Sequence, residues 1–135
     1  ADRLLGWRRS LLLVASAQVL GTLISEGIVA WRVAHGALPH AALTQDDVGS
    51  SFVVICALTF ALLYGWMGDA AIAVRIARPL AGLAGLIALR NYLVAGLSHL
   101  DVTAVGHTVS MLLAALLGGA LLAGRRRTRR REARP

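Results

Sequence analysis

Four stretches of this chain each come close to the length of apolar sequence that crosses a membrane as a single helix. A helix needs roughly 20 apolar residues to span a hydrocarbon core about 30 Å thick. The stretches cover about residues 10–31, 48–68, 76–100 and 102–124. With 57% hydrophobic and only 16% charged residues, the chain of 135 residues also has more apolar side chains than one small globular core can bury. The sequence therefore predicts an all-α integral membrane protein with four transmembrane helices.

The connections between these stretches are short. The longest reads RVAHGALPHAALTQDD, and Asp101 leaves only a tight turn between the third and fourth spans. Short connections join helices that lie side by side and run in opposite directions. We therefore expect residues 1–124 to form one antiparallel four-helix domain, followed by a basic tail at residues 125–135.

Arginine placement predicts the orientation of this bundle. All fourteen basic residues are arginines, and twelve of them precede the first span, lie between the second and third, or follow the fourth. Since cytoplasmic segments carry the excess of basic residues, both termini are expected in the cytoplasm. The arginine-for-lysine usage and the abundance of Ala, Leu and Gly suggest a high-GC bacterial source, so we expect a multi-pass protein of the bacterial cytoplasmic membrane.

The basic tail RRRTRRREARP directly follows the fourth span. In that position it is expected to stop translocation and to contact anionic lipid headgroups, at about 1 kcal/mol per arginine. Neither a folded reading module nor interleaved aromatic residues accompany it, so no nucleic-acid partner is expected. The headgroup residues are Arg125, Arg126, Arg127, Arg129, Arg130 and Arg131.

Charged and polar residues inside the apolar spans predict a buried polar cluster. Arg90 and Asn91 interrupt the run LAGLIALRNYLVAGL, and Glu26 lies near the outer end of the first span. An ionised group within the bilayer nearly always faces the bundle and pairs, so Arg90 is expected to meet Glu26, with Gln18, Asn91 and His107 as further partners. The cluster would act as a structural pin or as a proton or ion relay. Alternatively, the third helix ends near Leu89 and leaves RNY at the membrane interface.

Small residues at helical spacing predict which faces pack together. Close helix contacts in lipid favour small side chains. The second span carries no polar stripe, so it is expected to present most of its large side chains to lipid or to a partner. The expected packing ladders are Ala77, Ala81 and Gly85 on the third span and Ala115, Gly119 and Ala123 on the fourth, and the expected outward residues of the second span are Phe52, Val53, Phe60 and Leu63.

Ligand and catalytic motifs are weak. The possible metal ligands, none in a compact ligand motif, are His35, His40, His99, Asp101 and His107, and only His107 lies clearly inside a span for haem ligation. Neither a phosphate-binding loop nor a nucleophile elbow occurs, and no base stands beside Ser50 and Ser51 in the sequence. We therefore expect no cofactor, no metal and no enzymatic activity of the chain alone.

The stretch ASAQVLGTLISEG, from Ala15 to Gly27, resembles the first helix of the small multidrug resistance transporters. This resemblance implies a four-helix protein that works as a dimer and uses a glutamate in an A-E-V-x-G-T context. Gln18 stands at that position here and cannot cycle a proton. The resemblance covers about a tenth of the chain, and the later helices do not follow the family.

These observations favour a non-enzymatic membrane protein that acts as an accessory or assembly subunit of a larger membrane complex. Its partners would be the lipid bilayer and other membrane subunits or further copies of itself. Two alternatives remain open from the residues alone. One is a small homo-oligomeric transporter that uses Glu26, Arg90 and His107, and the other is a haem- or metal-binding redox subunit.

Overall fold

The computed structural model describes residues 2–44, 50–94 and 102–132, and the regular elements in these ranges are all helical. His99 and Asp101 lie outside the described residues. The elements are α1 (Asp2–Leu5), α2 (Trp7–Ala34), the 3-10 helix η1 (His40–Thr44), α3 (Ser51–Tyr64), α4 (Ile72–Ala88), α5 (Arg90–Val94) and α6 (Val102–Glu132). The expectation of an all-α chain therefore holds over these ranges.

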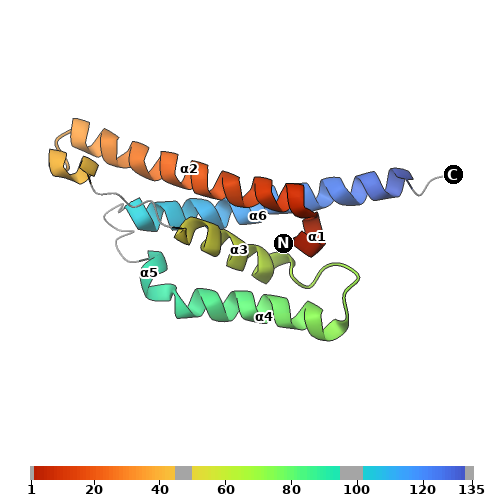
Figure 1. Ribbon diagram of the computed structural model, residues 1–135. Helices are drawn as coiled ribbons and strands as arrows, with labels where there is room; N and C mark the ends of the chain where they lie inside the picture. Colours follow the sequence, from red (N-terminus) through yellow and green to blue (C-terminus); the bar gives the residue numbers. More distant parts are fainter. Residues whose placement is uncertain (1, 45–49, 95–101, 133–135) are drawn as a thin grey trace.

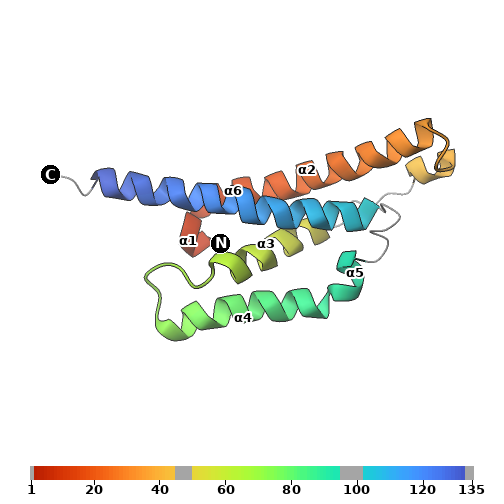
Figure 2. The ribbon, with the colours of Figure 1, turned by 180° about the vertical axis from the view of Figure 1, so that it is seen from behind.

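Two long helices, α2 and α6, lie side by side along the length of the molecule (Figures 1 and 2). Among the described residues, these two are long and apolar enough to cross a membrane. The 14 residues of α3 and the 17 of α4 span only about 21 and 25 Å, less than a hydrocarbon core of about 30 Å. The four-span antiparallel bundle is thus supported by two of its helices and stays a prediction for α3 and α4.

The central helix is α3, contrary to the expectation that it faces lipid. It packs against α2, α4 and α6, and the rings of Phe52 and Phe60 are fully buried. A helix that is apolar on every side is suited to burial on every side, and the lack of a polar stripe is better read in that way. Leu63, at 40% exposed, is the one of the four named residues that lies clearly on the outer surface.

The contact between α3 and α4 is a close approach of two backbones. A Cβ atom added to Gly82 would lie 2.6 Å from the carbonyl oxygen of Leu58. On this helix the expected ladder is wrong at two of its positions, because Ala77 and Ala81 are exposed while Gly82 is buried. Ala81 and Gly82 are both small, so the sequence alone does not decide which of the two faces α3. The path of the backbone decides it.

The interface of α6 is likewise displaced from the expected ladder. Ala114, Gly118 and Leu122 are buried, whereas Ala123 is exposed. Gly119 and Ala115 are half-buried and still belong to the interface of α6 with α3, since Tyr64 donates a hydrogen bond to the Ala115 carbonyl. The seam therefore includes small residues, one position away from those expected.

The third predicted span is interrupted. Helix α4 ends at Ala88, and the separate short helix α5 begins at Arg90 and runs in a different direction (Figure 1). The alternative in which the third helix ends near Leu89 agrees with this break, and residues 95–100 of the expected span lie outside the described residues.

Exchanging Gly82 for leucine should lower the free energy of unfolding by about 1 to 3 kcal/mol, because the new side chain meets the α3 backbone. The matched change Ala81→Leu, at an exposed position, should shift it by less than about 0.5 kcal/mol. Thermal unfolding in mild detergent measures both. Equal losses would contradict the close contact of α3 with α4.

Candidate functional site

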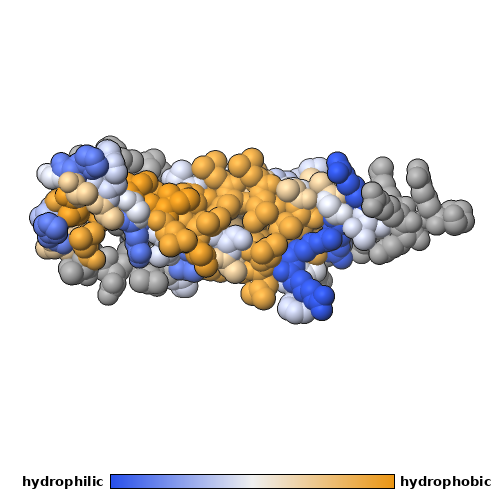
Figure 3. Space-filling view, turned by 90° about the horizontal axis from the view of Figure 1, so that it is seen from above, coloured by the Kyte–Doolittle hydropathy of each residue, from blue (hydrophilic) through white to orange (hydrophobic). Residues whose placement is uncertain are grey.

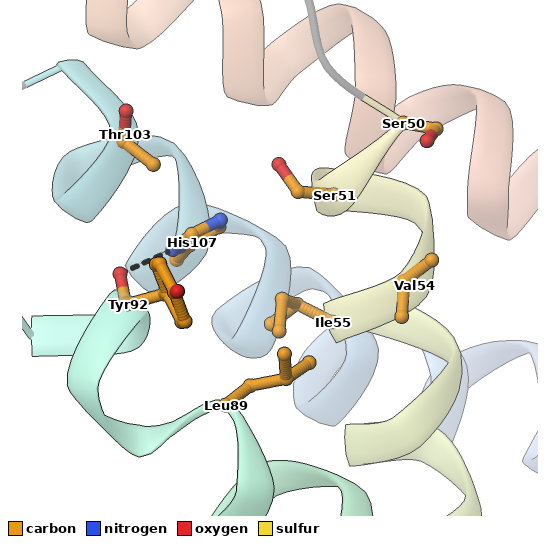
Figure 4. Close-up of a pocket in the computed structure, with 8 residues that line it drawn as sticks. All are labelled: Ser50, Ser51, Val54, Ile55, Leu89, Tyr92, Thr103 and His107. Carbon is orange, nitrogen blue, oxygen red and sulfur yellow. Dashed lines mark hydrogen bonds between the residues drawn. The ribbon is translucent and has the colours of Figure 1, made fainter.

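A pocket of about 410 Å³ lies where α3 begins, where α4 gives way to α5, and where α6 begins (Figure 4). Its wall is mainly apolar, with a few hydroxyl groups and one imidazole. The residues that line it are Ser50, Ser51, Val54, Ile55, Leu89, Tyr92, Thr103 and His107. An apolar cavity with a few convergent polar groups is the usual form of a ligand or active site.

His107 is the most buried polar residue of this wall, at 3% exposed. Its Nδ1 atom lies 3.1 Å from the carbonyl oxygen of Tyr92 on α5, as the dashed line in Figure 4 marks. A carbonyl oxygen only accepts, so Nδ1 carries the proton in this bond and Nε2 carries the lone pair. The geometry therefore sets the tautomer in which Nε2 can act as a base.

Phe52 holds the imidazole ring from the side. The two rings meet edge to face, with centroids 5.7 Å apart and planes at 84°. The phenyl ring occupies space left by two glycines, since a Cβ on Gly106 would lie 2.2 Å from its Cζ atom and one on Gly21 would lie 3.0 Å from its Cδ2 atom. Helices α2, α3 and α6 thus fix the position of Phe52, and with it the start of α3.

Ser51 is the first residue of α3 and directly precedes Phe52, so the contacts that hold Phe52 also set the position of Ser51. Its hydroxyl and the His107 ring line the same pocket from facing helices (Figure 4). Ser51 has no such neighbour close to it in the sequence, because His107 comes from α6, far along the chain. The available signals were a serine at the start of an apolar span and the one histidine clearly inside a span.

The expected buried cluster is not assembled within the chain. Glu26, Arg90 and Asn91 are exposed, and no ion pair joins Glu26 to Arg90 in the described structure. The inward stripe of α2 runs through Gly21 and Ser25, which leaves Glu26 beside it and facing outward. The break at Leu89 takes Arg90 off the α4 axis.

Of the expected cluster, the two residues that stay at least partly inside are His107 and Gln18. Gln18 is half-buried on α2, and its Oε1 atom has no hydrogen-bond partner in the described part of the chain. The pairing of Arg90 with Glu26 is therefore corrected, and His107 belongs instead to the pocket.

The other histidines do not form a metal centre in the described structure. His35 is exposed and its Nδ1 lies 2.8 Å from the Trp31 carbonyl, while His40 is exposed on η1. No three His, Cys, Asp or Glu side chains gather among the described residues. The single cysteine, Cys56, is buried on α3 as a small core residue.

Residues 1–128 match the family model of rhomboid-like proteins, which is nearly the whole chain. The chain belongs to the rhomboid-like family. This match replaces the resemblance of Ala15–Gly27 to the small multidrug resistance transporters, which covered only one helix. No curated protein and no solved structure matches this rhomboid-like chain. It is a small helical membrane protein, and the pocket at the start of α3 is lined by two serines and a histidine.

Replacing Gly106 by alanine should destabilise the site, because the added methyl group would overlap the Phe52 ring. We expect a loss of about 1 to 3 kcal/mol in the free energy of unfolding. Gly27→Ala is the matched control, since nothing lies within 4 Å of a Cβ at that exposed position of α2. Thermal unfolding in detergent should show no loss for Gly27→Ala, and equal loss in both variants would refute the proposed seating of Phe52.

Proposed function

We propose that this rhomboid-like chain carries a membrane-embedded serine hydrolase site that cleaves peptide bonds, with Ser51 as the nucleophile and His107 as its general base. The observation that carries the proposal is that both side chains line one pocket, with the Nδ1 atom of His107 bonded to the Tyr92 carbonyl. A nucleophile, a base and a third group that orients the base form the general pattern of an activated serine.

The chemistry follows from these positions. Nε2 of His107 accepts the proton of the Ser51 hydroxyl while Oγ attacks the substrate carbonyl carbon, and the resulting imidazolium then protonates the leaving amine. A water molecule, activated by the same nitrogen, hydrolyses the acyl-enzyme. The first turn of α3 starts at Ser51, so its amide groups and the positive end of its dipole favour the negative charge that develops on the substrate oxygen.

In the described structure Ser51 and His107 do not form a hydrogen bond with each other. Catalytic hydrogen bonds in unliganded enzymes are often long and shorten only when substrate binds. The apolar side chains of Val54, Ile55 and Leu89 fit an apolar peptide segment better than a charged one. We therefore infer that the substrate is an extended apolar segment of a membrane protein.

A second candidate keeps the interpretation from the sequence, a non-enzymatic accessory or assembly subunit of a membrane complex. It is favoured by the outer face of α4, where Ile72, Ile76 and Leu80 are all more than half exposed. Short helices with large apolar faces suit contact with the helices of another protein. The family is compatible with an active peptidase or an inactive pseudoprotease. In either case we expect a multi-pass protein of the bacterial cytoplasmic membrane.

The transporter and redox alternatives have less support. The transporter required Glu26 and Arg90 to work together, and both are exposed on different helices. A b-type haem required a second inward histidine, and His35 and His40 are exposed. Neither alternative accounts for the presence of Ser51 and His107 in one pocket.

A fluorophosphonate probe, which reacts with activated serines, tests the hydrolase. In native membranes we expect an adduct on Ser51, found by mass spectrometry, and its loss in Ser51→Ala. His107→Ala should slow labelling by about 100-fold or more, since general base catalysis contributes that much. Ser50→Ala, the neighbouring serine in the same pocket, is the control and should label normally.

The same experiment separates the two candidates. Labelling of Ser50 and Ser51 at equal, slow rates, with no effect of His107→Ala, would rule out an activated serine. That result would favour the accessory-subunit candidate. Purification in mild detergent should then recover a defined membrane partner at a constant ratio to this chain.

A further inference from the structure

The end of the molecule opposite the pocket is built from three separated segments. The guanidinium of Arg125 on α6 donates a hydrogen bond to the Leu4 carbonyl of α1. The Leu4 side chain lies against the connection between α3 and α4, since a Cβ on Gly68 would be 2.7 Å from its Cδ2 atom. The start of the chain, this connection and the last helix therefore meet at one end of the bundle.

Tryptophan and arginine occur in pairs at this end. The Arg8 guanidinium carbon lies 5.3 Å from the centroid of the Trp7 ring, and Trp7 is 65% exposed. Arg75 donates from Nε to the Trp66 carbonyl over 2.8 Å, and Trp66 is 51% exposed. Exposed tryptophans are enriched at the level of lipid headgroups, where one part of the ring contacts acyl chains and another contacts water. Both pairs thus mark the same boundary between apolar and aqueous surroundings.

The last helix passes through this boundary without ending. Helix α6 continues through the arginine run as far as Glu132, and Arg127 is exposed on it. Hydrophilic side chains gather in Figure 3 beside the point where this helix leaves the apolar band. The run has basic residues on all sides of the helix and therefore no apolar face that could lie in the membrane plane.

We propose that Arg8, Arg75 and Arg127, beside Trp7 and Trp66, form a belt that binds the phosphate groups of anionic phospholipids. This belt extends the headgroup contact expected of the tail to two further segments of the chain. Guanidinium groups form paired hydrogen bonds with phosphate oxygens, and the adjacent indoles place those oxygens at the edge of the apolar band. A nucleic acid would contact the arginines, but its binding would not explain why the indoles lie at the edge of the apolar band.

The test uses the full chain in nanodiscs of phosphatidylcholine with increasing phosphatidylglycerol, and counts bound lipid by native mass spectrometry. We expect preferential binding of phosphatidylglycerol that weakens with salt. The double change Arg8→Gln with Arg127→Gln should weaken the apparent binding constant for phosphatidylglycerol about 25-fold, at about fivefold per arginine. Arg90→Gln is the matched control, because it removes one exposed arginine at the opposite end.

Three outcomes would overturn the belt: equal binding of the two lipids by the unmodified chain, an equal loss in Arg90→Gln, or displacement of phosphatidylglycerol by an oligonucleotide at matched phosphate concentration. Circular dichroism checks that each variant stays helical. The readout does not involve Ser51, so the lipid belt and the hydrolase can each fail without the other.

Discussion

The structure depends on the ring of Phe52, which fills the space between two glycines. Gly21 of α2 and Gly106 of α6 let these two long helices, which pack against each other, both contact the start of α3. With larger residues there, α3 could not pack against both helices, and Ser51 would not share a pocket with His107. The two Phe52 contacts therefore link helix packing to the geometry of the site.

Sequence reasoning could predict the features that depend on composition along a single helix. The apolar lengths of α2 and α6 and the placement of arginines at one end follow from residues that are local in sequence. The central position of α3 could not be predicted, because an apolar helix without polar residues suits lipid and a protein core equally well. Only the glycines on its neighbours decide, and they lie on other helices.

The candidate site shows the same division. The sequence identifies His107 as an inward residue. It places Arg90 and Glu26 in the same cluster only if the third span is one straight helix. Depth along a helix can be counted from the sequence, whereas a change of direction at Leu89 cannot. The sequence does not connect Ser51 with His107, because the two residues lie on helices that are far apart in the chain and meet only in the folded structure.

The break at Leu89 also explains how His107 obtains its partner. In an unbroken helix, residues 90–94 would continue along the α4 axis. Because of the break, α5 leaves the α4 axis and packs against α6, which brings the Tyr92 carbonyl to His107. The Tyr92 carbonyl accepts from the imidazole of His107. One local change in the chain path thus places Arg90 on the outer surface and brings the Tyr92 carbonyl to the imidazole, so the exposed arginine and the hydrogen bond of His107 have the same physical cause.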